Sequence, residues 1–154
     1  MRQESGMTLI VKRITRITVS LIFLFGIYIV LHGHLTPGGG FAGGVIIALS
    51  FIHLVLAFGK KVALKRISEA TISAFESIGG VFFWSIALGG LLFSGVYFLN
   101  FLPKGEAFSL FSAGTIVFCN IAIFLKVGAG LFAIFVALAF LRMPDDPKEG
   151  GKAA

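Results

Sequence analysis

Apolar residues in this sequence form long uninterrupted runs, unlike the mixed apolar and polar spacing of a soluble domain. The longest run without a charged residue extends from Ile17 to Gly59, which is 43 residues. Two further runs extend from Ser77 to Pro103 and, with a single charge, from Ala107 to Leu141. Because about 20 apolar residues in a helix cross a hydrocarbon core of ~30 Å, these runs predict helices that span a lipid bilayer.

The 43-residue run is long enough for two crossings, and helix-breaking residues interrupt its middle. A proline and three glycines follow one another from Pro37 to Gly40, which favours the end of one helix and the start of another. The pattern therefore predicts an all-α integral membrane protein with about four transmembrane helices. We expect a four-helix domain over residues 1–143, with spans at 17–31, 40–58, 78–98 and 113–141, and a flexible cytoplasmic tail over 144–154.

The composition supports the membrane assignment and gives an orientation. Hydrophobic residues make up 57% of the chain and charged residues 13%, whereas about 25% of residues are charged in soluble domains. Eleven of the 13 lysines and arginines lie before the first span, between the second and third, or after the fourth. Because basic residues concentrate in short cytoplasmic loops, we expect both termini on the cytoplasmic side. The net charge of +6 therefore reflects membrane topology, and no nucleic-acid partner is expected.

Lys126 is the one charged residue inside the last apolar run. It lies 16 residues before Arg142, about 24 Å along a helix, so its side chain would not reach the cytoplasmic headgroups. A charge at that depth costs at least ~2.5–3.5 kcal/mol, and residues of this kind commonly belong to ion or proton paths. The alternative is a structural lysine, bonded to backbone carbonyls or to an acid. Because the sequence offers no acid at the expected depth, we expect the partner of Lys126 on a neighbouring subunit or in a hydrated cavity.

Two other titratable residues could join an ion or proton path. His53 lies within the second span, where it could relay protons or make a hydrogen bond across a helix interface. Glu76 stands at the expected cytoplasmic start of the third span, where it could be a polar anchor or the mouth of a path. Neither residue belongs to a nucleophile–base pair or a nucleotide-binding motif, so the sequence does not indicate an autonomous enzyme or a catalytic residue.

The segment around the helix break carries interface candidates rather than a metal site. His32 and His34 resemble half of a metal site, but no further cluster of ligands accompanies them, so no metal is expected. Small residues four apart, which permit close helix packing, pair Gly39 with Gly43 and Gly40 with Gly44. Asn120 would face away from Lys126 and hydrogen-bond to another helix. The interface candidates are therefore His32, His34, Pro37, Gly38, Gly39, Gly40, Gly43, Gly44 and Asn120.

Two segments resemble a known family of membrane proteins. The stretch from His32 to Gly44, which reads HGHLTPGGGFAGG, resembles the signature of the B subunit of Mrp/Mnh-type multisubunit Na⁺/H⁺ antiporters. The stretch from Asn120 to Gly130, NIAIFLKVGAG, is similar to the last helix of that family. Chain length and the four-span layout agree, so the resemblance covers nearly the whole chain.

The resemblance implies a small membrane subunit that supports assembly and cation/proton translocation. Its partners would be other membrane subunits, including large ones similar to the proton-pumping subunits of respiratory complex I. The transported ions would be Na⁺ and H⁺, with no cofactor in this chain. The resemblance supplies no catalytic residue to transfer, so the role of Lys126 rests on the physical argument alone.

The same family also implies an alternative host for the chain. Homologous subunits occur in archaeal membrane-bound hydrogenases and sulfur-reducing complexes, which couple ferredoxin oxidation to sodium export. This chain could serve either assembly, and neighbouring genes for iron–sulfur subunits would favour the redox-driven one. A standalone transporter or scaffold is a further alternative, which activity of the isolated chain in liposomes would support.

The expected orientation is tested by the reactivity of cysteines placed on the two sides. In a variant whose Cys119 is replaced by serine, Lys104→Cys should react with a membrane-impermeant thiol reagent in intact cells. Lys152→Cys should react only after the cells are opened. Labelling of position 152 from outside intact cells would contradict cytoplasmic termini.

Overall fold

Four α-helices make up the regular structure of the chain. The computed structural model describes residues 7–59, 68–106, 108–110 and 112–142. Its helices are α1 (Leu9–Leu31), α2 (Gly39–Phe58), α4 (Glu69–Ser94) and α5 (Thr115–Arg142), and the described residues contain no strand. Each helix is long and apolar enough to cross a membrane. The prediction of an all-α protein with four transmembrane helices is confirmed, whereas the predicted tail, 144–154, lies outside the described residues.

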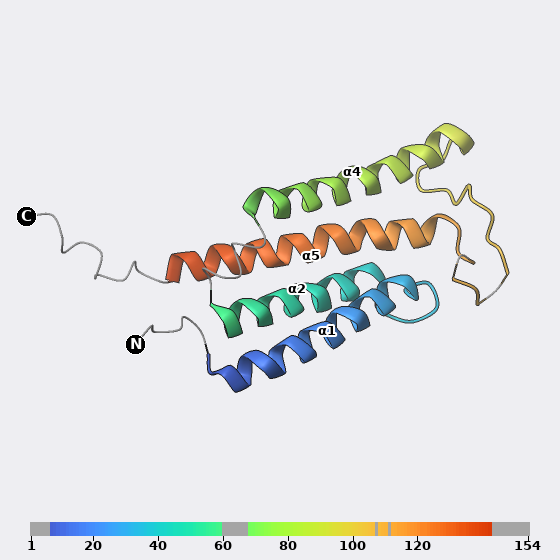
Figure 1. Cartoon of the computed structure of the whole chain (residues 1–154). Coiled ribbons are helices and arrows are strands. Elements are labelled where there is room, and N and C mark those ends of the chain that lie inside the picture. The colour runs from blue at the N-terminus through green and yellow to red at the C-terminus, as the bar shows by residue number, and fades with distance from the viewer. Residues whose placement is uncertain (1–6, 60–67, 107, 111, 143–154) are drawn as a thin grey trace, which may run out of the picture.

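The helices lie side by side in the order α1, α2, α5, α4 (Figure 1). α2 packs between α1 and α5, and α5 packs between α2 and α4. The N-terminal end of α1 and the C-terminal end of α5 lie on the same side of the helix bundle (Figure 1). Between 17% and 33% of the residues in the apolar part of each helix are buried within the chain, so most of the helix surface is left for lipid or for partner subunits.

The helices extend beyond the apolar runs that predicted them. α1 begins at Leu9 and not near residue 17, so Arg16 lies within the helix, with its guanidinium 5.4 Å from the centre of the Phe58 ring. α4 begins at Glu69, nine residues before the expected start, where the Ser68 side chain accepts a hydrogen bond from the Thr71 N–H. An apolar run marks the thickness of the hydrocarbon core, and it does not mark where backbone hydrogen bonding starts.

The far end of α4 is set by a glycine. Gly95 adopts the left-handed conformation, with φ of 72°, and its N–H bonds to the Leu91 carbonyl. This conformation commonly ends a helix because glycine has no Cβ to clash. α4 therefore stops at Ser94, four residues before the end expected from the apolar run.

Neighbouring glycines let α2 approach a different helix on each side. A Cβ atom on Gly43 would collide with the Val30 side chain of α1 and lie 3.0 Å from the Gly26 carbonyl oxygen. A Cβ on Gly44 would lie 3.0 Å from the Val127 Cβ of α5. Because consecutive helix positions point about 100° apart, these two glycines bring α1 and α5 against adjacent faces of α2.

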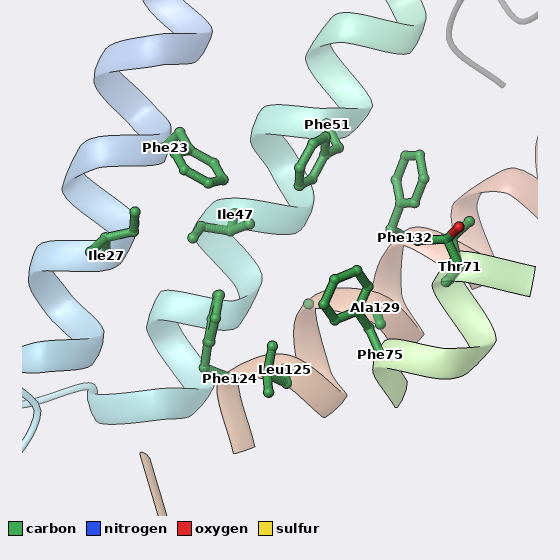
Figure 2. A pocket seen from close by; sticks show the side chains of 12 residues that line it. Phe23, Ile27, Ile47, Phe51, Thr71, Phe75, Phe124, Leu125, Ala129 and Phe132 are labelled. Carbon is green, nitrogen blue, oxygen red and sulfur yellow. The ribbon is translucent and has the colours of Figure 1, made fainter. Parts of the chain in front are cut away.

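One face of the helix row contains an apolar groove of about 500 Å³ (Figure 2). All four helices contribute to it, and Thr71 is the only lining residue with a polar side chain. Two of its lining residues, Ile72 and Phe132, form with Val55 and Val136 a buried cluster that joins α2, α4 and α5. The groove lining is Phe23, Ile27, Ile47, Phe51, Thr71, Ile72, Phe75, Phe124, Leu125, Gly128, Ala129 and Phe132.

The close contact of α1 and α2 is tested by filling the space at Gly43. Gly43→Leu should destabilise the folded chain, since overpacking of a tight contact costs about 1–3 kcal/mol or more. Thermal unfolding in mild detergent and the yield of the assembled complex measure the loss. Phe41→Leu, at a 62% exposed position on the same helix, is the control and should change neither. Normal stability of Gly43→Leu would contradict close packing at this position.

Candidate functional site

The structure pairs Lys126 of α5 with Glu76 of α4. The Lys126 Nζ lies 3.5 Å from a Glu76 carboxylate oxygen, to which it donates a hydrogen bond. Both residues lie within the parts of their helices that are long and apolar enough to cross a membrane, Thr115–Ala139 and Ala70–Ser94. Opposite charges in contact avoid the cost of an isolated charge in hydrocarbon, so the pair gives each side chain a partner.

This pairing corrects two expectations from the sequence. The expectation that the sequence offers no acid at the depth of Lys126 was wrong, since Glu76 belongs to the same chain. Glu76 also does not start its helix, because α4 begins seven residues earlier at Glu69. α5 has 28 residues, about 42 Å in length, which exceeds the hydrocarbon core.

Two consecutive glycines of α4 make the pairing possible. A Cβ on Gly79 would lie 2.7 Å from the Lys126 backbone nitrogen and 2.8 Å from the Ala122 carbonyl oxygen, so only glycine allows this approach. At Gly80, the Cβ position is 3.7 Å from Lys126 Nζ. The lysine side chain thus lies across Gly80, one helical turn from Glu76. The sequence analysis did not single out Gly79 and Gly80, although a glycine doublet inside an apolar run is a usable signal.

His53 lies at a different helix contact from the ion pair. Its Nε2 is 3.5 Å from the Thr15 hydroxyl of α1, and Thr15 is buried. The structure therefore places His53 where α1 meets α2, whereas Lys126 and Glu76 join α5 to α4. These three path candidates do not form one cluster.

The two histidines at the end of α1 have separate partners. His32 donates from Nδ1 to the Tyr28 carbonyl at 3.0 Å and stacks on the Tyr28 ring. His34 donates from Nε2 to the Ser109 carbonyl at 3.0 Å, which ties the first interhelical loop to the last. Among the described residues, no group of three or more His, Cys, Asp or Glu is placed to hold a metal ion.

Asn120 packs against the start of α2 at the Pro37–Gly40 break. Pro37 and Gly38 are exposed, whereas Gly39 and Gly40 are buried. The Gly40 N–H donates to Asn120 Oδ1 at 3.3 Å, and a Cβ on Gly40 would collide with the Asn120 backbone. Asn120 thus accepts a hydrogen bond from α2. Its own Nδ2 is buried and has no hydrogen-bond partner among the described residues.

Asn100 organises the start of α5, a role that the sequence analysis missed. Its Nδ2 donates to the Ala113 carbonyl at 2.9 Å, and its Oδ1 accepts from the Thr115 N–H at 2.9 Å. The side chain thereby satisfies a free N–H of the helix start, as a capping residue does. Residues 13 and 15 positions away supply these partners, so local sequence signals do not reveal the contact.

Comparisons with known proteins agree on one family. Residues 10–133 match the family described as a domain related to the MnhB subunit of Na⁺/H⁺ antiporter. A Staphylococcus haemolyticus protein named "Putative antiporter subunit mnhB2" is 31% identical over 139 residues, which cover 84% of this chain and 93% of that protein. An uncharacterized protein of Methanocaldococcus jannaschii is 38% identical over 118 residues, or 72% of this chain. The match spans only 44% of that archaeal protein.

A solved structure shares both the fold and part of the sequence. It is the membrane-bound sulfane sulfur reductase, an archaeal respiratory membrane complex, one chain of which aligns with a TM-score of 0.72 and 30% identity. The alignment covers 89% of this chain and 59% of that chain. Since the family match extends over most of the described helices, this multi-pass membrane protein belongs to the family of domains related to the MnhB subunit of Na⁺/H⁺ antiporters.

Proposed function

We propose that the chain is a membrane subunit of a multisubunit Na⁺/H⁺ antiporter in which Lys126 and Glu76 belong to the proton path. The observation that carries this proposal is an ion pair inside the membrane-spanning parts of two helices. Ionisable residues at such positions are costly and mark ion or proton paths. Membership in a family related to an antiporter subunit supports the same function.

The chemistry of the pair suits transient proton binding. An ammonium and a carboxylate 3.5 Å apart can exchange one proton and become a neutral amine and a carboxylic acid. This internal exchange keeps the pair neutral, so neither form leaves an uncompensated charge in hydrocarbon, which would cost several kcal/mol. A proton arriving from one side of the membrane would bind the Glu76 carboxylate and give the pair a net charge of +1. Release of a proton from the Lys126 ammonium toward the other side would restore the neutral pair.

The ions and partners follow from the antiporter assignment. Na⁺ and H⁺ would be the transported ions, and this chain would hold no cofactor. Its partners would be other membrane subunits, including complex I-like antiporter subunits, and transport would require the assembly. Both termini of the chain would be cytoplasmic. His53 would stabilise the contact of α1 with α2 through Thr15 and stay outside the path of Lys126 and Glu76.

A second candidate function is the equivalent subunit of a redox-driven respiratory complex. The structural alignment with one chain of the archaeal sulfane sulfur reductase supports it, at 30% identity and a TM-score of 0.72. In that complex the chain would serve the ion-translocating module and hold no redox cofactor. Purification in mild detergent distinguishes the two hosts, because iron–sulfur subunits would co-purify only with the redox-driven assembly.

The proposed role of Lys126 predicts different losses in two variants. Removal of a positioned proton-transfer group lowers rates by about 10²-fold or more, so Lys126→Ala should lower coupled Na⁺/H⁺ transport by at least roughly tenfold. Lys126→Arg keeps the positive charge and should restore assembly better than transport, because arginine does not release its proton in proteins. Transport is measured in membrane vesicles that contain the complex, and assembly on a native gel.

Lys104→Ala provides the control, since Lys104 is an exposed lysine in the loop after α4, and it should transport normally. Full transport by Lys126→Ala would remove Lys126 from the mechanism. Loss of assembly in the alanine variant, together with full transport in the arginine variant, would show that the ion pair is only structural.

A further inference from the structure

The ion pair is half exposed, although it lies between two membrane-spanning helices. The side chains of Lys126 and Glu76 are 55% and 43% exposed within this chain. In water such exposure would need no explanation. In the hydrocarbon core of a membrane, lipid chains offer no hydrogen bonds to the exposed parts of either group, so the described residues alone leave the pair incompletely solvated.

The hydrogen-bonding capacity of the pair is also largely unused. A lysine ammonium has three donors and a carboxylate has about four acceptor sites. Glu76 is the only hydrogen-bond partner of Lys126 among the described residues. Something outside the described part of the chain must therefore supply polar groups to both side chains.

The exposed Lys126 and the apolar groove lie on different sides of α5. Phe124 and Gly128 line the groove, as Figure 2 shows for Phe124, and both point about 160° around the helix from Lys126, which does not line it. Gly130 points about 200° around α5 from Gly128 and has open space where its Cβ would be. We call the surface formed by Glu76, Gly80, Lys126, Gly130 and Ala137 the charged face.

The two faces require different neighbours in a membrane. The groove lining is almost entirely apolar, and lipid chains satisfy such a surface as well as a protein does. The charged face combines an ion pair with two glycines and an alanine. Small residues allow the backbone of another helix to approach closely, and polar side chains hydrogen-bond across such contacts.

We propose that the charged face packs against a transmembrane helix of a partner subunit, which presents a polar side chain to Lys126 and Glu76. Gly130, one turn along α5 from the lysine, has open space where its Cβ would be and leaves room for that helix. The partner then completes the hydrogen bonds of the pair and excludes lipid from it. This interface holds whether the pair conducts protons or is only structural, so it goes beyond the proposed function.

Photocrosslinking in the intact complex tests the interface. A diazirine amino acid is placed at Gly130 or at Ala137, with Phe124 on the groove side of the same helix as the control. Assembly of each variant is checked on a native gel, and the exposed Ala137 position serves if substitution at Gly130 prevents assembly. Mass spectrometry identifies the peptide that is crosslinked.

We expect positions 130 and 137 to crosslink to one transmembrane helix of one partner subunit, several-fold more strongly than position 124. That helix should carry a polar residue within one turn of the crosslinked site. Crosslinks to lipid alone, or equal protein crosslinks from position 124, would overturn the proposal. So would reaction of Gly130→Cys in the assembled complex with a membrane-impermeant thiol reagent, because it would show an aqueous surface there.

Discussion

A charged side chain inside a membrane needs a polar partner, and the contact of α4 with α5 supplies one for Lys126. The pairing depends on how closely the two backbones approach. At Gly79 the approach leaves no space for a Cβ beside the Lys126 nitrogen, and this proximity brings Glu76 within 3.5 Å of the ammonium group. A larger residue at position 79 would separate the helices and leave two unpaired charges in a medium of low dielectric constant. The glycine and the ion pair are therefore one structural unit.

Glycines also determine how closely the remaining helices approach one another. Gly43 admits α1, and Gly40 and Gly44 admit α5, so the order of the row follows from small residues on adjacent faces of α2. The resulting row buries few of its own residues and presents two unlike faces, one apolar and grooved, the other bearing the ion pair. Such a surface suits a subunit whose grooved face contacts lipid and whose face with the ion pair contacts another protein.

The length of the apolar runs was sufficient to predict the number of helices, because membrane thickness dictates how many residues a span needs. The break at Pro37–Gly40 and the importance of Lys126 were also readable from residue type. The partner of Lys126 was not, because Glu76 lies 50 positions away in the sequence and only the packing of α4 against α5 brings the two side chains together. Contacts such as that of Asn100 with Thr115 depend on how a loop folds back, and no local pattern encodes them.

In the proposed function, Lys126 and Glu76 act as one unit in transport. A double-mutant cycle of Glu76→Gln, Lys126→Ala and the double variant tests it most directly, with transport measured in vesicles and assembly verified for each variant. Residues that act as a unit show strongly non-additive effects. We therefore expect the double variant to transport about as well as the worse single variant. A double variant whose loss equals the product of the two single losses would show that the residues act independently, and it would contradict this account.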